Sequence, residues 1–312
     1  MRRKPIRISR SAAAIQNADM TGKNVIITGA TAGVGKDTAR SLAKMGANVI
    51  LATRNEDKTR DTIAEIREHL DNGAVVLEHR YLDLTDLDSV RGFGSTFGAT
   101  DTVDVLINNA GVAHETGVTK QGVERIFGIN YLSHFLLTKE LMPILARSKA
   151  RIINVSSMGF MSANRKHFDM PYTGECSQMS PQQRYGRSKA AQILFTKALQ
   201  RRFAGKNIGC TCSSLHPGCV RTGIFDTYDL AYKALVYVLW PFMIETDEGA
   251  RTSVFLATTD RRDEIGGRYF YYGLFLRGIY EKNGSALLND KELQEFVWRE
   301  SEELIGEEFH IA

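Results

Sequence analysis

The sequence lacks the features that mark secreted, metal-binding and membrane-spanning proteins. Its four cysteines form no C-x-x-C pair, and no apolar segment of a secretory signal begins the chain. We therefore expect Cys176, Cys210, Cys212 and Cys219 to be free thiols in a reducing compartment. No predicted helix carries two histidines at metal-binding spacing, so we expect no metal site.

An excess of charge of one sign is also missing. The chain has 40 Lys and Arg against 36 Asp and Glu, and a net charge of +4, with the two signs interspersed. This balance gives no reason to expect nucleic acid as the main partner.

The first eighteen residues are the exception, because no acidic residue precedes Asp19. The basic residues there are Arg2, Arg3, Lys4, Arg7 and Arg10. A solvated, disordered arm over residues 1–20 is the favoured interpretation, since Pro5 interrupts any early amphipathic helix. A mitochondrial targeting segment is the alternative. We accordingly expect a cytoplasmic protein, with a mitochondrial location as the second interpretation.

Short β-branched segments alternate with longer helical patterns along most of the chain. The strands are expected at 24–28, 48–52, 75–82, 103–107, 151–156 and 208–215, and the helices near 34–46, 57–70, 87–97, 122–147 and 181–203. This alternation predicts βαβ units and a buried, doubly wound parallel sheet with helices on both faces. No linker or repeat divides residues 21–312, so a single α/β domain is expected.

The most apolar stretch covers residues 230–244. It contains Lys233 and Pro241 and is shorter than the ~20 residues that a membrane-spanning helix needs. A packed helix or a lid over the substrate, spanning about 222–247, is favoured over a surface that contacts membrane.

A glycine-rich loop joins the first predicted strand of the sheet to a helix. The loop residues expected to hold a nucleotide are Gly29, Thr31, Gly33, Val34 and Gly35. In this position, backbone N–H groups and the positive end of the helix dipole can receive a pyrophosphate, and glycine allows close approach. The loop is not a Walker A motif, because Gly29 lies one residue too far from Lys36 and Asp37 replaces the magnesium-binding Ser or Thr.

The residues after the second predicted strand indicate which dinucleotide is bound. Arg54 stands where an NAD enzyme carries an acidic residue for the ribose, and Lys36 lies in the nearby loop. These cations predict NADP(H), whose 2′-phosphate adds negative charge. Asp83 is a candidate for the adenine amino group, with a helix N-terminal carboxylate as the alternative.

Tyr185 and Lys189 are one helical turn apart, so both side chains lie on the same face. A phenol that exchanges a proton near neutral pH needs its pKa lowered by about three units, or roughly 4 kcal/mol, which one nearby ammonium can nearly supply. Ser157 ends a strand at the edge of the sheet where ligands bind, and could hydrogen-bond a substrate oxygen. Its neighbour Ser156 is the other candidate.

Taken in order from Thr21 onward, these motifs resemble the short-chain dehydrogenase/reductases. The matching elements are the T-G-x-x-x-G-x-G loop, Asp83, the N-N-A-G run from Asn108 to Gly111, Asn130, Ser157, Tyr185-x-x-x-Lys189 and Pro217-Gly218. Within that family, the chain is most similar to retinol dehydrogenases and related NADP-dependent enzymes. The features that carry this closer likeness are Arg54, the long interval between Ser157 and Tyr185, and the segment 248–253.

The resemblance implies a Rossmann-type sheet of about seven parallel strands. It also implies that Ser157 is the catalytic serine and that Asn130 positions a water linked to Lys189, unless Asn130 only bonds backbone inside the fold. The further cofactor contacts that it implies are Leu84, Asn109, Ala110, Gly111, Pro217, Gly218 and Thr222, beside Tyr185 and Lys189 themselves.

The motifs together predict an NADP(H)-dependent oxidoreductase that interconverts a carbonyl and an alcohol. The apolar segment and the insertion at 159–184 favour a hydrophobic substrate such as a retinoid, a sterol or a long-chain aldehyde. The alternatives are an NADPH sensor without turnover and a nucleic-acid-binding role for the basic arm. A homodimer and a peripheral membrane contact are left open.

Overall fold

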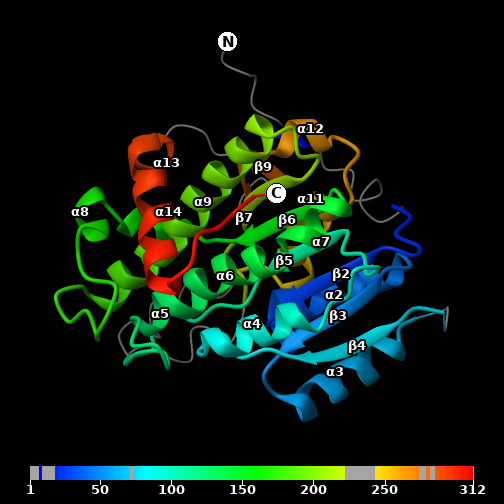
Figure 1. The fold of residues 1–312 in the computed structure, drawn as a ribbon. Coiled ribbons are helices and arrows are strands. Elements are labelled where there is room, and N and C mark those ends of the chain that lie inside the picture. The colour runs from blue at the N-terminus through cyan, green and yellow to red at the C-terminus, as the bar shows by residue number, and fades with distance from the viewer. Residues whose placement is uncertain are drawn as a thin grey trace.

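A computed structural model of the chain describes residues 7–8, 18–70, 74–221, 243–273, 279–281 and 285–311. Its strands are β1 (Arg7–Ile8), β2 (Asn24–Thr28), β3 (Asn48–Thr53), β4 (Leu77–Tyr81), β5 (Val105–Asn108), β6 (Arg151–Val155), β7 (Thr211–His216), β8 (Tyr269–Tyr272) and β9 (Ile279–Glu281). They form one sheet in the order β1-β9-β8-β7-β6-β5-β2-β3-β4 (Figure 1).

Seven neighbouring strands of the sheet are mutually parallel: β4, β3, β2, β5, β6, β7 and β8. This arrangement confirms the predicted Rossmann-type sheet. β9 pairs antiparallel with β8, and β1 pairs antiparallel with β9. Neither β9 nor the edge strand β1 was predicted. β1 comes from the predicted N-terminal arm, whose residues 1–6 and 9–17 lie outside the described part of the chain.

Alternate residues of the central strands enter two separate hydrophobic clusters, one on each face of the sheet. Ile26, Leu106 and Ile152 face one cluster, whereas their neighbours Ile27, Ile107 and Ile153 face the other. The first cluster is covered by α4 (Leu87–Ser95), α6 (Ser133–Glu140), α7 (Met142–Arg147), α9 (Pro181–Gly205) and α14 (Lys291–Ile305). The second is covered by α2 (Gly33–Lys44), α3 (Glu56–Arg67) and α11 (Thr246–Thr258).

The single helix predicted near 122–147 is wrong. This stretch contains α5 (Arg125–Phe127), a π-helix η1 (Gly128–Leu132), α6 and α7. The break between α6 and α7 comes at Leu141, shortly before Pro143, whose ring removes a helical hydrogen-bond donor. The π-helix widens the backbone at Asn130, and such bulges are frequent at functional sites.

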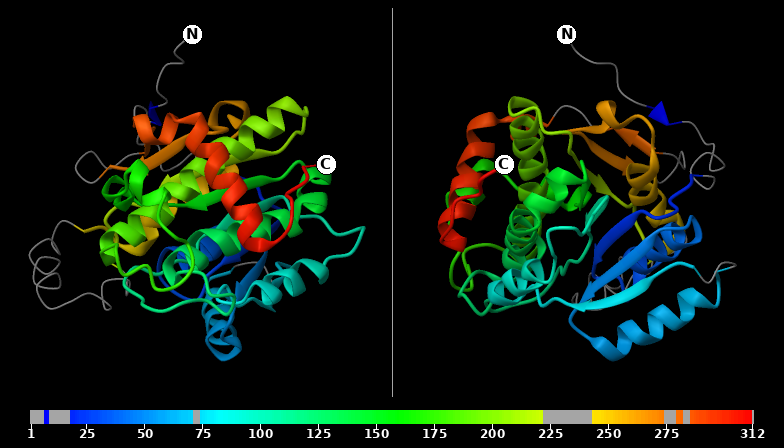
Figure 2. Two further views of the ribbon diagram at one scale, coloured as in Figure 1. Left: turned by 60° about the vertical axis from the view of Figure 1, so that its left-hand side comes forward. Right: turned by 45° about the vertical axis from the view of Figure 1, so that its right-hand side comes forward.

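The C-terminal helix α14 packs on the side of α9 that faces away from the sheet (Figure 2). The short helix α13 (Ala286–Asn289) precedes it. Trp298 stacks on Phe309 with ring centroids 5.0 Å apart, and both rings pack edge-on against Phe135 of α6. The end of the chain therefore covers the same face of the sheet as α6 and α9.

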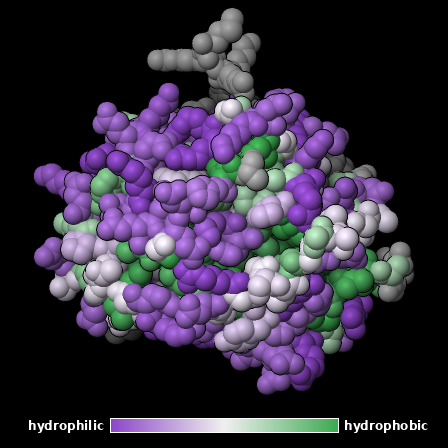
Figure 3. Space-filling view, in the orientation of Figure 1, coloured by the Kyte–Doolittle hydropathy of each residue, from purple (hydrophilic) through white to green (hydrophobic). Residues whose placement is uncertain are grey.

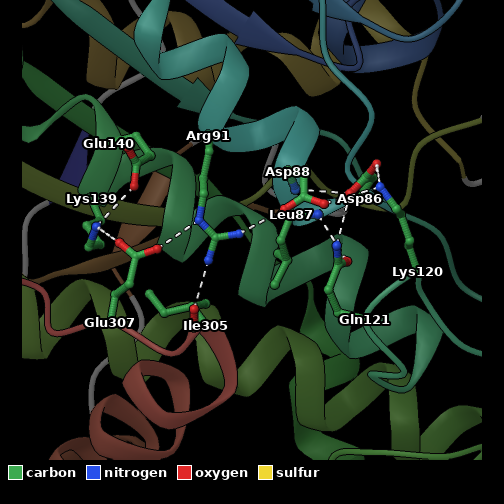
Figure 4. A network of polar contacts seen from close by, with 10 residues as sticks. All are labelled: Asp86, Leu87, Asp88, Arg91, Lys120, Gln121, Lys139, Glu140, Ile305 and Glu307. Atoms are coloured by element: carbon green, nitrogen blue, oxygen red, sulfur yellow. Dashed lines mark hydrogen bonds and ion pairs between the residues drawn. The ribbon is translucent and has the colours of Figure 1, made fainter.

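A polar network fastens this C-terminal segment to the domain (Figure 4). Glu307 accepts hydrogen bonds from Arg91 of α4, at 2.8 Å, and from Lys139 of α6. Arg91 also donates to the carbonyl oxygen of Ile305 at 2.8 Å. These contacts hold Ile305, at the end of α14, and Glu307, just beyond it, against two helices that precede them by more than 160 positions.

Most of the predicted lid at 222–247 lies outside the described residues, which resume at Met243. Met243 and Ile244 are both buried. In the orientation of Figure 1, the surface is mainly hydrophilic and its apolar residues form separate small patches (Figure 3). Where the chain is described, no helix combines the length and the apolarity needed to cross a bilayer.

Candidate active site

A cavity of about 1340 Å³ opens at the carboxyl ends of the parallel strands. Sixteen of the eighteen predicted site residues line it: Gly29, Thr31, Gly33, Val34, Gly35, Arg54, Asp83, Leu84, Asn109, Ala110, Gly111, Ser157, Tyr185, Lys189, Pro217 and Gly218. Asn130 is buried beside the cavity without lining it, and Thr222 lies outside the described residues. The structure thus brings together the predicted nucleotide and catalytic groups.

The backbone conformation of the glycine loop and its contacts with neighbouring residues both require glycine. Gly29 and Gly33 have φ of +65° and +54°, values that favour glycine. A Cβ at Gly29 would lie 2.9 Å from Ala110, and one at Gly35 would meet the amide of Asn109. We predicted glycine here for close approach to a pyrophosphate. The structure adds a second reason at Gly29 and Gly35, which is their close approach to the Asn-Asn-Ala-Gly run.

The N-terminus of α2 and the first N–H groups of this helix lie in this loop. Its N-cap, Ala32, offers no side-chain acceptor, and the first turn contains no acidic residue. These N–H groups and the helix dipole are therefore available to an anion, as the nucleotide prediction requires.

Two cations line the region expected for the 2′-phosphate. Arg54 is 63% exposed, with Nη1 3.8 Å from Oδ2 of Asp83, and Lys58 lies in the first turn of α3. The predicted contribution of Lys36 is wrong, because its ammonium donates to both oxygens of Glu65 at 2.9 Å and does not line the cavity. Lys58 was missed. A cation in the first turn of a helix is unfavourable because it opposes the helix dipole. The unfavourable position of Lys58 could therefore have identified it as a candidate for anion binding.

Asp83 does not cap a helix, so the alternative that we left open for it is wrong. Its Oδ1 accepts from the backbone N–H and the hydroxyl of Thr85, both at 2.8 Å. The N-cap of α4 is Asp86, whose carboxylate accepts from the N–H of Asp88. Asp83 therefore forms a turn on the wall of the cavity.

Lys189 is buried on α9 one turn beyond Tyr185, with its Nζ 5.7 Å from the centre of the phenol ring. The ammonium donates to the carbonyl oxygen of Val155 at 2.9 Å. Burial lowers the pKa of Lys189 to about 7. The charge that we invoked to acidify the phenol is thus itself destabilised by its surroundings.

The two candidate serines have different hydrogen bonds. The hydroxyl of Ser156 is buried and donates to the carbonyl oxygen of Lys189 at 2.7 Å, so it is used inside the fold. Ser157 caps the 3₁₀ helix η2 (Met158–Ser162), and its Oγ accepts from the N–H of Gly159 at 3.0 Å. Ser157 remains the catalytic candidate.

Asn130 uses its side chain within the fold. Oδ1 accepts from the N–H of Val112 at 2.8 Å, and Nδ2 donates to the carbonyl oxygen of Val112 and the hydroxyl of Ser188. Gln192 donates to the carbonyl oxygen of Asn130 at 2.7 Å. These contacts favour the alternative in which Asn130 bonds backbone inside the fold.

A buried histidine, not predicted, links Asn130 to the glycine loop. The hydroxyl of Thr28 accepts two backbone N–H groups from the Asn-Asn-Ala-Gly run, so its own proton is donated to Nε2 of His134 at 2.9 Å. Nδ1 of His134 therefore carries the ring proton and donates to the carbonyl oxygen of Asn130. Burial lowers the pKa of His134 to about 4, which keeps the ring neutral in this role.

Several apolar side chains and one ion pair also line the cavity. Val112, Ala113, Met158 and Met161 line it, and Met161 is 60% exposed. Arg125 donates to Glu115 at 2.6 Å, and both side chains also line the cavity. This pair was not predicted, because its two residues belong to no motif in the sequence.

The insertion at 159–184 is held by buried charges. Glu124 and Arg187 are both fully buried and lie 3.9 Å apart. Arg187 also donates to the carbonyl oxygens of His167, Met170 and Pro171. Arg184 approaches the other oxygen of Glu124 at 3.9 Å. The insertion is therefore fixed to the turns of α9 on either side of Tyr185.

The chain resembles a known family over most of its length. The sequence profile of the short chain dehydrogenase family matches residues 23–232. The chain therefore belongs to the short-chain dehydrogenase/reductase family: it is an oxidoreductase of that family, whose members bind a nicotinamide dinucleotide.

The predicted likeness to the retinol dehydrogenases is confirmed. Retinol dehydrogenase 13 of Homo sapiens is 36% identical over 300 residues, which cover 93% of this chain and 86% of that protein. Polyprenol dehydrogenase of Homo sapiens is 34% identical over 289 residues, covering 90% and 84%. A crystal structure of an uncharacterised protein from Mycobacterium paratuberculosis is 31% identical, with a TM-score of 0.75 over 95% of this chain and 98% of that one.

Proposed function

We propose that this protein is an NADP(H)-dependent oxidoreductase that interconverts a carbonyl and an alcohol on a hydrophobic substrate. One observation carries the proposal: a single cavity is lined by the glycine loop, by Arg54 and Lys58, and by Ser157, Tyr185 and Lys189. A nucleotide site and a proton donor are then adjacent, as carbonyl reduction requires.

The charges at the ribose end favour the phosphorylated dinucleotide. Arg54 and Lys58 offer two cations to a 2′-phosphate, and the residue directly after β3 is Arg54 and not an acid that would accept a hydroxyl. The carboxylate of Asp83 is already engaged by Thr85, which reduces its repulsion of the phosphate.

Part of the cavity favours an apolar substrate. Two methionines and two small aliphatic residues line it, and the flexible thioether side chain of methionine adapts to irregular apolar ligands. The relatives whose names state a substrate are dehydrogenases of retinol and of polyprenol, both long apolar alcohols. We therefore infer a retinoid, polyprenoid, sterol or long-chain aldehyde substrate class.

A bound nicotinamide dinucleotide supplies or accepts the hydride. Tyr185 donates a proton to the carbonyl oxygen in reduction and removes it from the alcohol in oxidation. Ser157 donates a hydrogen bond from its hydroxyl to the same oxygen as negative charge develops there, and it keeps its proton. When protonated, Lys189 favours the ionised form of the phenol through its charge.

The test is a substrate panel with the full-length protein. We would follow absorbance of NADPH and, separately, NADH with all-trans-retinal, a long-chain aldehyde, a sterol ketone and a small polar ketone. We expect higher kcat/KM with NADPH, and with the apolar substrates. Equal or better efficiency with NADH would contradict the cofactor assignment, and fastest turnover of the polar ketone would contradict the substrate class.

A further inference from the structure

Gly159 of the 3₁₀ helix η2 and Gly186 of the catalytic helix α9 allow the two helices to approach each other closely. A Cβ at Gly186 would lie 2.8 Å from the carbonyl oxygen of Gly159 and 3.1 Å from the backbone nitrogen of Ala163. The hydroxyl of Ser162 lies 2.8 Å from the carbonyl oxygens of both Gly159 and Gln182, which ties the two helices together. The segment after Ser157 is therefore pressed against the backbone next to Tyr185.

Gly159 is at the centre of this contact. A Cβ added there would lie 2.7 Å from Cε1 and 2.9 Å from Cδ1 of Tyr185, and 3.4 Å from Oγ of Ser157. Distances below 3.0 Å force a neighbour to move. The described glycines with positive φ do not include Gly159, so backbone strain does not require glycine at this position. The ring of Tyr185 is what excludes a side chain.

Gly159 also contacts the second catalytic group. Its N–H donates to Oγ of Ser157 at 3.0 Å. A hydroxyl has one proton and two lone pairs, so this bond uses an acceptor site and leaves the proton of Ser157 free to be donated. A substrate carbonyl oxygen needs such a donor.

We propose that Gly159 is a positioning residue that sets the phenol ring of Tyr185 and the hydroxyl of Ser157 toward one substrate oxygen. It does so by presenting a bare Cα to the ring and a backbone N–H to the serine. The inference rests on the proposed function, because it acts through the catalytic roles of those two residues.

The first test is Gly159→Ala in the full-length protein, with Gly205→Ala as the matched control. Gly205 ends α9 and has no atom within 4 Å of an added Cβ. We expect Gly159→Ala to lower kcat by roughly 10- to 100-fold, as a small misplacement of a reacting group does. The Kd for NADPH should stay within about twofold, and Gly205→Ala should leave kcat unchanged.

Substrate size separates positioning from simple obstruction, since Gly159 also lines the cavity. Displacement of Tyr185 lowers kcat equally for a short aldehyde and for retinal. If only the KM of the bulky substrate rises, Gly159 merely shapes the cavity and the proposal is wrong.

A comparison of the single variants Tyr185→Phe and Gly159→Ala distinguishes a failure of this inference from a failure of the proposed function. If Tyr185→Phe alone leaves turnover intact, the proposed function fails. If Tyr185→Phe abolishes most turnover while Gly159→Ala keeps full kcat, only the inference about Gly159 fails.

A stability measurement covers the case in which Gly159→Ala does not fold. Tyr185→Ala removes the ring that the new methyl group would meet, so the double variant Gly159→Ala/Tyr185→Ala should fold with the Tm of Tyr185→Ala. A double variant that is unfolded, or that loses as much in Tm as Gly159→Ala does alone, would overturn the proposed contact.

Discussion

The ammonium nitrogen of Lys189 lies 2.9 Å from the carbonyl oxygen of Val155, in surroundings that lower the pKa of the lysine to about 7. Because the unfolded chain protonates this lysine up to about pH 10.5, folding excludes a proton between these two values. The cost of the buried charge is complete below pH 7 and disappears as pH rises toward 10.5.

Lys189→Met should therefore stabilise the protein most at low pH. We expect its free energy of unfolding to exceed that of the wild type by a few kcal/mol at pH 6, which is the free-energy equivalent of the lowered pKa of Lys189. This difference should shrink as pH rises from 7 to 10. Urea unfolding at several pH values measures it. A difference that does not change with pH would show that Lys189 is not desolvated, and the activity of the variant should be lost in either case.

Arg54 and Lys58 should determine cofactor preference. We expect Arg54→Ala or Lys58→Ala to raise the Kd for NADPH by about 10- to 100-fold, the value of one charge-assisted contact, and to leave the Kd for NADH within about twofold. Lys36→Ala is the matched control, since its ammonium is held by Glu65. A comparable loss of NADPH affinity in Lys36→Ala would contradict the assignment of the two cavity cations.

Glu124 should be essential to the insertion beside the catalytic helix. Glu124→Gln leaves Arg184 and Arg187 without their buried anion, and we expect the free energy of unfolding to fall by about 3–5 kcal/mol. Glu115→Gln breaks a partly exposed ion pair and should cost less than about 1 kcal/mol. Similar losses for the two variants, measured by urea unfolding, would argue against the buried cluster.

Glu307 should make the C-terminal segment sensitive to acid. Hydrogen bonds from Lys139 and Arg91 lower the pKa of Glu307 below its usual 4.5. The stabilisation is therefore present above pH 4.5 and is lost as pH falls through the lower folded pKa. We expect Glu307→Gln to cost about 1 kcal/mol at pH 7.

The matched control for Glu307 is Glu308→Gln, whose carboxylate is 78% exposed beside His310. We expect this variant to unfold like the wild type at pH 7. The difference between wild type and Glu307→Gln should shrink as pH falls below 4.5, and a difference that does not change with pH would show that the ion pairs are not its source.

The parts of the fold and of the site that could be predicted from sequence are those determined by residues close together in the chain. β2 and its glycine loop are continuous in the chain, and their strand-turn-helix pattern has one common structural outcome. The spacing of Tyr185 and Lys189 follows from helical geometry alone. These predictions needed no knowledge of distant contacts.

Contacts between distant residues account for what was missed. The aromatic run of β8 is a strand because it pairs with β7, more than fifty residues earlier, and α14 is fixed by rings from α6 and α9. Lys36 lies near the loop in sequence, yet Glu65 of the neighbouring helix decides where its ammonium points. The charges of Glu124 and Arg187 gave no sign that both would be buried together.

The most direct test of the account is turnover by Tyr185→Phe, with Tyr81→Phe, an exposed tyrosine outside the cavity, as the control. We would measure kcat with NADPH and a long-chain aldehyde, and NADPH binding by fluorescence. We expect a loss of kcat of about 10²- to 10⁴-fold in Tyr185→Phe, with the affinity for NADPH retained. Undiminished turnover in a folded Tyr185→Phe protein would contradict it.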